Sequence, residues 1–330
     1  MNRGIERAFI AACAYIVAAP AGSQTASTSS GQGWPTRPVR IIVPFAPGGG
    51  VDTVSRFLAQ KLTEQVGSTF VVENRPGAAG VLGAELVAKA PPDGHTLFTS
   101  APEFSINPSV RAKLPYDPFR DFAYISKLTS GQFMLVSHPS VPVWTVKQLI
   151  ALAKARPGEL NYGSSGAGGI NHLAGELLQS MAGIRWVHVP YKGAGPATAA
   201  LMGGEIGFVF ASTTGLIAPA KAGKVRPIAV TGPKRFSELP ETPTIAESGL
   251  PGYNVTGWYG FYAPAGTPPQ ILKRLNDEAR KGLYSADVKD KLEKTGNEPV
   301  VSTPDEFVAF MRTEIDKWAK VVKSANIRVE

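Results

Sequence analysis

The sequence is nearly free of cysteine. Its one cysteine, Cys13, lies in the apolar run from Ala8 to Ala19, which follows Arg3 and Arg7. A basic start, an apolar run and small residues after it are typical of a secretory signal peptide, here predicted over residues 1–21. The mature chain would then contain no cysteine, which excludes disulfides, zinc–thiolate clusters and a cysteine nucleophile.

A long hydrophobic run is also missing. The apolar part of the signal segment is shorter than the ~20 residues that a membrane-spanning helix needs. We therefore expect a periplasmic protein, cleaved near Ala19 or Ala21. A lipoprotein cleavage box at 10–13 is the weaker alternative, because it would leave few apolar residues before Cys13.

No run of lysines or arginines occurs. The chain has 34 Lys and Arg against 26 Asp and Glu, a formal net charge of +8, but the basic residues are scattered among acidic ones. Scattered charge gives a modest field that attracts small anions, whereas nucleic acid is usually bound by a basic cluster. We therefore expect no nucleic-acid partner.

The tract rich in Ser, Thr, Gly and Gln at 22–35 predicts a flexible linker. The ~300 residues after the signal segment are enough for two domains. Without disulfides, these domains must be held together by their hydrophobic cores.

Glycine is concentrated where predicted strands end. Residues 39–43 predict a buried strand, Gly48–Gly50 a turn, and Val51–Val66 an amphipathic helix. A flexible turn at a helix N-terminus presents unpaired N–H groups at the positive end of the helix dipole, which favours an anion. Two alternatives stay open: glycine also serves chain reversal itself, and Asp52 in the first helical turn could satisfy these N–H groups.

The same strand, glycine loop and helix unit recurs along the chain. The further glycine loops lie at 74–80, 162–169 and 190–196. Alternating strands and helices predict doubly wound, mostly parallel sheets, whose ligands lie outside the carboxyl ends of the strands. The loops at 44–50, 74–80 and 100–107 should therefore share one rim.

The middle of the chain predicts a boundary. Two short strands are expected at 124–127 and 133–137, followed by the breaker-rich segment 138–142 and a fresh helix from Thr145. A second α/β unit begins there.

Residues that could support catalysis lack the required context. Ser164 and Ser165 suggest a hydrolase, but Ala167 stands where a Gly-x-Ser-x-Gly motif around Ser165 needs glycine. The four histidines lie far apart without metal-ligand spacing, and His172 beside Glu176 is interpreted as a solvated or capping side chain. Dinucleotide and Walker motifs are absent from the sequence. We predict a protein that is not an enzyme and uses no cofactor or metal.

Seven segments match one known family in order. They are Val43–Gly49 with Asp52, Glu73–Ala78, Leu114–Pro118, Tyr162–Gly166 with His172 and Leu173, Val189–Gly193, Glu241–Gly249, and Gly257–Gly260 with Ala263–Pro268. Together they resemble the Bug receptors, the extracytoplasmic solute-binding proteins of tripartite tricarboxylate transporters. The resemblance covers nearly the whole mature chain.

The resemblance implies a two-lobed periplasmic-binding-protein fold, type II-like, in which each lobe is a doubly wound, mostly parallel sheet and a hinge lies between them. Lobe 1 would comprise 36–138 and 256–330, and lobe 2 would comprise 139–255. Such a receptor is monomeric, closes on a small carboxylate and passes it to the permease subunits of its transporter.

In the family, backbone N–H groups and hydroxyls of facing loops hold the ligand, often through water. The ligand-binding residues expected here are Phe45, Ala46, Pro47, Gly48, Gly49, Ser100 and Glu103 on lobe 1, and Ser164, Ser165, Gly166, Tyr191, Lys192, Ala211 and Ser212 on lobe 2. A dicarboxylate would bridge the lobes.

Some positions depart from the family pattern. Ala211 and Ala200 stand where many members have acidic or amide side chains. Glu103, at a commonly neutral position, would repel a second carboxylate or attract an amine, unless it is simply solvated on its loop. Phe45, Phe104 and Tyr191 could stack on an aromatic ligand or pack within the lobes; Lys192 is interpreted as an anion-facing or solvated charge.

Three functions remain open on the sequence. We expect a transport receptor for a di- or aromatic carboxylate. A periplasmic sensor that presents its ligand to a signalling partner would have the same sequence features. An exported hydrolase using Ser164 or Ser165 is the weakest alternative.

Overall fold

The computed structural model describes residues 33–191, 193–294 and 296–328. The predicted signal peptide and most of the predicted linker lie outside the described residues. The elements described below belong to one compact unit, Trp34–Glu330.

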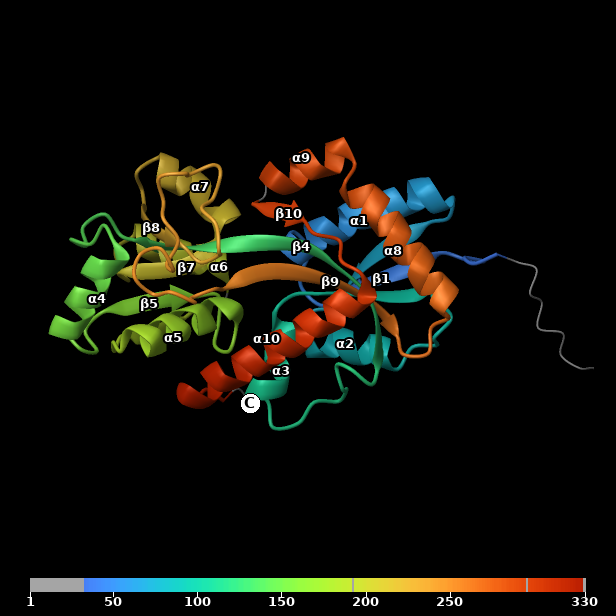
Figure 1. Ribbon diagram of the computed structural model, residues 1–330, viewed down its shortest axis with the longest axis horizontal. Helices are drawn as coiled ribbons and strands as arrows, with labels where there is room; N and C mark the ends of the chain where they lie inside the picture. The colour runs from blue at the N-terminus through green and yellow to red at the C-terminus, as the bar shows by residue number, and fades with distance from the viewer. Residues whose placement is uncertain (1–32, 192, 295, 329–330) are drawn as a thin grey trace, which may run out of the picture. The chain divides into compact units, whose positions relative to one another are not determined.

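A single mixed sheet forms the centre of this unit (Figure 1). Its strands are β1 (Val39–Val43), β2 (Phe70–Asn74), β3 (Thr96–Ser100), β4 (Phe122–Ser137), β5 (Asn161–Ser164), β6 (Val187–Pro190), β7 (Phe208–Ser212), β8 (Arg226–Val230), β9 (Thr256–Pro264) and β10 (Asn297–Pro299). The main path runs β2, β1, β3, β9, β4, β7, β5, β6, while β8 and β10 each pair with β4.

The two ends of the sheet are parallel and its middle is antiparallel. Strand β1 pairs in parallel with β2 and β3, and β5 with β6 and β7. The sequence of β1, VRIIV, is the nearly continuous apolar run that a parallel strand covered by helices requires. Strands β4 and β9 are antiparallel to their neighbours. The predicted α/β binding-protein fold is confirmed, with a more mixed sheet than the sequence suggests.

Helices cover both faces of the sheet. They are α1 (Gly50–Val66), α2 (Val81–Ala88), α3 (Glu103–Val110), α4 (Val146–Ala155), α5 (Ile170–Ala182), α6 (Ala194–Met202), α7 (Thr213–Lys221), α8 (Pro269–Leu283), α9 (Ala286–Lys294) and α10 (Pro304–Ser324), with a short 3₁₀ turn at Ala78–Gly80. The start of α10 is fixed by a capping box, in which Thr303 and Glu306 each accept the other's backbone N–H.

Strand β4 is continuous over 16 residues, where the sequence predicts two short strands. Residues 129–131, Thr-Ser-Gly, are turn formers, which is why the pattern breaks there. In the folded chain they pair with β9 on one side and with β10 on the other, so their backbone groups are satisfied by distant segments. Figure 1 shows β4 and β9 running side by side through the middle of the unit.

The core consists of four clusters of buried hydrophobic residues. Two lie on opposite faces of the sheet around β1 and β3, and two on opposite faces around β5 and β7. Helix α10 joins one cluster at each end, because Phe307 packs with the cluster of Ile42 and Trp318 with the cluster of Tyr162. The two ends of the sheet therefore share a helix as well as β4 and β9.

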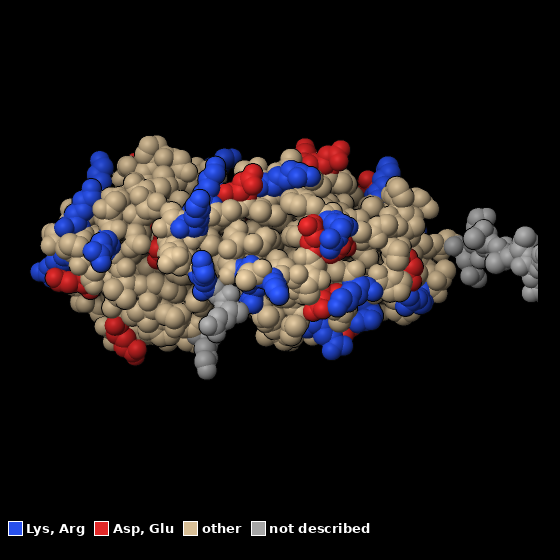
Figure 2. Space-filling model, turned by 90° about the horizontal axis from the view of Figure 1, so that it is seen from below, with Lys and Arg blue, Asp and Glu red and all other residues tan. Residues whose placement is uncertain are grey.

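Charge is distributed as the sequence predicts. On the face shown in Figure 2, lysine and arginine side chains are interspersed with aspartate and glutamate. Ion pairs one helical turn apart recur along the described helices, such as Lys273 with Asp277 and Lys294 with Asp290.

Candidate functional site

A cavity of about 580 Å³ lies where five helices begin. Its wall includes Gly49, Gly50 and Val51 of α1, Pro102 and Glu103 of α3, Gly169, Ile170 and Asn171 of α5, Gly193 and Ala194 of α6, and Ser212, the N-cap of α7. The first N–H groups of each helix have no partner within that helix, and the helix dipole is positive there. Five such ends around one space favour a negatively charged ligand.

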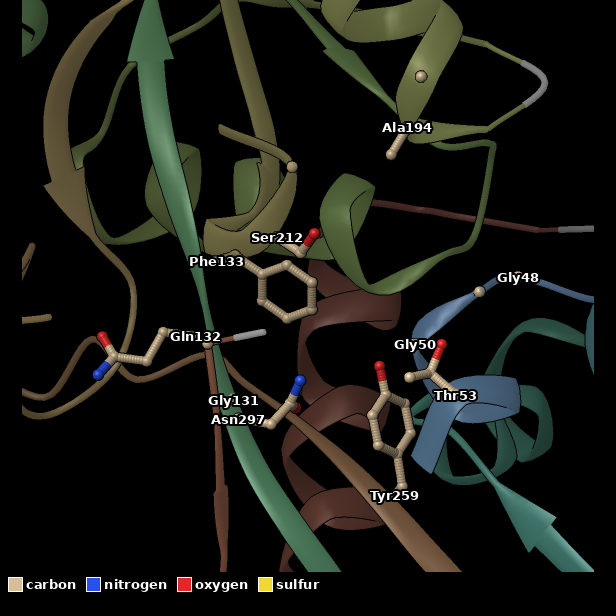
Figure 3. A pocket seen from close by; sticks show the side chains of 15 residues that line it. Gly48, Gly50, Thr53, Gly131, Gln132, Phe133, Ala194, Ser212, Tyr259 and Asn297 are labelled. Atoms are coloured by element: carbon tan, nitrogen blue, oxygen red, sulfur yellow. The ribbon is translucent and has the colours of Figure 1, made fainter. Parts of the chain in front are cut away.

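A second cavity of about 500 Å³ adjoins the first (Figure 3). The two share Gly49, Gly50, Phe133, Ala194, Ser212, Gly257 and Tyr259. We call them together the ligand cavity. The three lobe-1 loops predicted to share a rim all reach it, through Phe45, Ala79 and Glu103.

Asp52 turns away from the ligand cavity. Its buried carboxylate accepts the Gly48 N–H at 2.9 Å, two N–H groups of Arg56 at 2.9 Å, and the Asn74 amide at 2.9 Å. Burial alone would raise its pKa, but these donors lower the pKa below the ordinary value, so the group is ionised. Asp52 therefore shapes the glycine turn and leaves the N–H groups of Gly50 and Val51 to the cavity.

Tyr259 of β9 closes the wall beside α1. A Cβ atom at Gly50 would lie 2.0 Å from the Tyr259 hydroxyl oxygen, so any larger residue at this position would have to displace the tyrosine side chain. Figure 3 shows the phenol pointing at the first turn of α1, next to Thr53. Burial and the negative charge of Glu103 raise the pKa of Tyr259, which keeps its hydroxyl protonated and able to donate.

Ser164 supports the cavity wall from behind. Its hydroxyl lies 2.6 Å from His188 Nε2, donates to the Gly166 carbonyl oxygen at 3.0 Å, and accepts the Gly166 N–H at 3.1 Å. The side chain is fully buried. Ser165, by contrast, lines the cavity, and its Oγ accepts the side-chain amide of Asn171 at 3.3 Å.

His172 is a buried capping residue. Its Nδ1 accepts the Gly168 N–H at 3.0 Å, which agrees with the capping interpretation, whereas the solvated alternative is wrong. Its ring stacks on His188, so two histidines that lie 16 positions apart in sequence are neighbours in space. Burial lowers both pKa values, to about 3 for His172, where His188 contributes, and to about 4 for His188.

Glu103 is the first residue of α3, and the solvated-loop alternative for it is wrong. Its carboxylate lies beside the start of α5, where Gly169 and Ile170 line the same cavity. Burial raises its pKa. Among the described residues that line the larger cavity, Glu103 has the only side chain with a formal charge.

The structure brings about half of the predicted site residues to the ligand cavity. Those that line it are Phe45, Gly48, Gly49, Glu103, Ser165, Gly166 and Ser212. Ala46 and Pro47 lie on the exposed side of the turn, whereas Ser100, Ser164 and Ala211 are buried. Lys192 lies outside the described residues.

Each buried exception has a local cause. Ser100 donates to the Tyr262 hydroxyl at 3.1 Å, and Ala211 packs in the core, while its neighbour Ser212 reaches the cavity. The Tyr191 ring packs against the same core cluster as Ala211. Phe104 is buried and stacks on Tyr116 with ring centroids 5.5 Å apart, so it packs within the fold.

Sequence reasoning misses several residues of the wall. They are Gly50, Val51, Phe133, Asn171, Ala194 and Tyr259. Gly50 and Ala194 lie within the predicted loops at 44–50 and 190–196, and Val51 and Asn171 follow predicted loops within two residues. Counting each whole loop and the first turn of its helix would therefore find all four. Phe133 and Tyr259 reach the site through the pairing of β4 with distant strands, for which the sequence gives no local signal.

Two features are missing from the described ranges. No helix there combines the length and the apolar character of a membrane span. Likewise, no group of three or more His, Cys, Asp or Glu side chains in those ranges is placed to hold a metal ion.

The two ends of the mixed sheet share the strands β4 and β9, and an anion-favouring cavity lies at helix N-termini. This arrangement defines a solute-binding protein of the periplasmic type. The sequence model of a protein family, described as the tripartite tricarboxylate transporter family receptor, matches residues 54–327. The chain belongs to this family, that of the Bug receptors.

Related proteins align with nearly the whole length of this chain. BugT of Bordetella pertussis is 34% identical over 316 residues, covering 95% of this chain and 94% of that protein. The structure of R. palustris Rpa4515 with adipate is 38% identical, with a TM-score of 0.81, and covers 90% of this chain and 99% of that one. The structure of MatC from Rhodopseudomonas palustris with bound malate is 30% identical, with a TM-score of 0.75, and covers 88% and 100%.

Proposed function

We propose that this protein is an extracytoplasmic receptor that captures a small carboxylate and delivers it to the permease of a tripartite tricarboxylate transporter. The observation that carries the proposal is the meeting of five helix N-termini around one cavity. Backbone N–H groups and the hydroxyls of Tyr259, Ser165 and Ser212 supply donors for the carboxylate oxygens. The adipate and malate in the two related structures support the same ligand class.

We propose further that the ligand is held between two lobes, 36–138 with 256–330, and 139–255. The cavity wall draws α1 and α3 from the first and α5, α6 and α7 from the second. A ligand that contacts both sets gains its full hydrogen bonding only when the lobes close, which shifts the population toward the closed form. The crossing strands β4 and β9 would serve as the hinge.

The test is a thermal-shift screen of mono-, di- and aromatic carboxylates on the purified protein, after native mass spectrometry for a carried-over ligand. A ligand at a hundred times its Kd should raise the free energy of unfolding by about 2.7 kcal/mol. The primary amide of each stabilising acid is the matched control and should have little effect. If no carboxylate stabilises the protein, the proposed ligand class is wrong.

Delivery needs a separate test in the native host. Deleting the gene should abolish uptake of the identified carboxylate, and plasmid-borne protein should restore it. Intact uptake with a lost transcriptional response would instead identify a periplasmic sensor. We also propose export to the periplasm, which cell fractionation of the full chain would check.

A further inference from the structure

Glu103 occupies the place where the second lobe would bind a ligand carboxylate. Helix α5 follows the glycine loop 162–169, and its first N–H group, that of Ile170, is the natural donor to an anion. In this structure the Glu103 carboxylate lies close to that N–H group. A Cβ atom at Gly169, the N-cap of α5, would lie 3.9 Å from Glu103 Oε1, which places the carboxylate directly beside the helix start.

The surroundings of Glu103 offer further acceptors. Asn171 is only 4% exposed, and its side-chain Oδ1 has no hydrogen-bond partner among the described residues. Asn171 lines the same cavity as Glu103, and its Nδ2 already donates to Ser165. This part of the wall therefore presents two carboxylate oxygens and an amide oxygen, and it lacks a cationic side chain among its described residues.

The part of the wall around the start of α1 presents hydrogen-bond donors instead of acceptors. The start of α1 at Gly50 and Val51 keeps its N–H groups available, because Asp52 is engaged by Gly48, Arg56 and Asn74. The Tyr259 hydroxyl lies beside the same turn. One part of the cavity thus donates hydrogen bonds, and the other, around Glu103, accepts them.

We propose that Glu103 makes the cavity selective for a monocarboxylate whose far end carries a hydrogen-bond donor, an ammonium above all. This inference rests on the proposed function, since it names the ligand class of the same site. The ligand carboxylate binds at the start of α1, and the donor group binds Glu103 and Asn171. A second carboxylate would have to take the place of Glu103 beside the Ile170 N–H and would then remain next to a negative charge.

The test compares ligands of equal length by isothermal titration calorimetry at pH 8. For each chain of four to eight carbons, the probes are the α,ω-dicarboxylate, the ω-amino acid, the ω-hydroxy acid and the plain fatty acid. Wild-type protein should bind an ω-amino acid at least about tenfold more tightly than the matched dicarboxylate, as expected for one charge-assisted hydrogen bond gained or lost. A dicarboxylate that binds equally well or better would overturn the inference, without the need for any variant.

The isosteric variant Glu103→Gln provides the second arm. It should lose about tenfold in affinity for the ω-amino acid and gain affinity for the dicarboxylate, because an amide can donate to it. Glu159→Gln is the matched control, since it removes one negative charge from an exposed position and should leave both affinities unchanged. An unchanged ligand ranking in Glu103→Gln would overturn the inference.

A protonated Glu103 that donates to a second carboxylate gives a different pH profile. Dicarboxylate affinity would then rise in wild type, and not in Glu103→Gln, as the pH falls from 8 to 6; that result would also overturn the inference. If the proposed receptor function is itself wrong, none of the carboxylate probes should bind. Binding of several probes in an order independent of Glu103 would leave the receptor function standing and remove only the selectivity.

Discussion

The imidazole rings of His172 and His188 stack with their centroids 3.7 Å apart and their planes 13° from parallel. Gly168 N–H donates to one ring and Ser164 Oγ is bonded to the other, so the pair supports the loop that forms the cavity wall. Both pKa values are lowered by burial, to about 3 and about 4, and the rings are neutral at neutral pH. A proton on either ring would place a charge in a buried stack.

This pair predicts acid sensitivity. Below about pH 6.5 the unfolded histidines bind protons while the folded ones do not, so the free energy of unfolding should fall as the pH drops. For His172 the loss should reach about 2 kcal/mol at pH 5 and stop growing near its folded pKa of about 3. Glu176 acts in the opposite direction, because burial raises its pKa and its folded form takes up a proton first as the pH falls.

Urea unfolding at pH 7.5 and pH 5 checks this prediction. His172→Gln removes the His172 contribution while Glu176 stays, so its stability should fall less between the two pH values than that of wild type. His138→Gln is the control, since the His138 ring bonds only its neighbour Ser140 in the described structure and should leave the wild-type difference unchanged. Equal losses in wild type and His172→Gln would contradict the prediction.

Substitution of the two adjacent serines should have different effects: Ser165→Ala should lower ligand affinity, and Ser164→Ala should lower stability. Ser165→Ala removes a hydroxyl from the cavity wall and is expected to weaken carboxylate binding by about 1.5 to 3 kcal/mol, the worth of a hydrogen bond to a charged group. Ser164→Ala leaves buried partners unsatisfied and should lower the free energy of unfolding by about 1 to 3 kcal/mol, with a smaller effect on affinity. Calorimetric titration and urea unfolding of both variants measure the two effects; the reverse pattern would show that Ser164 contacts the ligand.

Gly50→Ala should block the cavity without breaking α1. Alanine is a good helix former, but its Cβ would lie 2.0 Å from the Tyr259 hydroxyl and 3.0 Å from the ring carbon that bears it. We expect the Tyr259 ring to be displaced and carboxylate affinity to fall at least tenfold, with an unchanged circular dichroism spectrum. Gly203→Ala is the control, because its nearest contact is an ordinary 3.5 Å. If Gly50→Ala binds the carboxylate with wild-type affinity, the start of α1 is not part of the binding site.

Asp52→Ala should destabilise the glycine turn. The Gly48 N–H and the Asn74 amide would lose their shared acceptor, whereas Arg56 is about half exposed and can be solvated. We expect the free energy of unfolding to fall by about 2 kcal/mol at pH 7. Because the folded pKa of Asp52 is lowered, its contribution exists above the unfolded value near 4 and is lost in acid. The difference between wild type and Asp52→Ala, measured by urea unfolding, should therefore shrink toward pH 3.

The strand, glycine turn and helix units could be predicted from the sequence because each is specified within about 30 residues. The apolar run of β1, the glycines after it and the helical spacing of Val54, Leu58 and Leu62 are local signals. Their common rim follows from the rule that parallel strands end at one edge. The identity of the individual wall residues depends on side-chain direction, which is why Ser164 and Ala211 turned out buried and Ser165 and Ser212 line the cavity.

The remaining features depend on contacts between distant segments. Tyr259 meets Gly50 only because β9 crosses the sheet beside β3, and Glu103 meets Ile170 only because α3 and α5 start at the same place. No spacing rule relates positions that lie 67 or 209 residues apart. Family resemblance supplied the overall architecture, and the structure supplied the direction of each side chain.

Strand β4 has a consequence for how the protein can be divided. Its first part pairs with β9 and β10, and its last part with β7 and β8. A fragment that contained one end of the sheet without β4 would expose a row of unpaired backbone N–H and C=O groups, which invites aggregation. Neither end can therefore be expressed alone or exchanged as a separate module, and a recombinant chimera of two such receptors would have to inherit β4 together with the partners of both its parts.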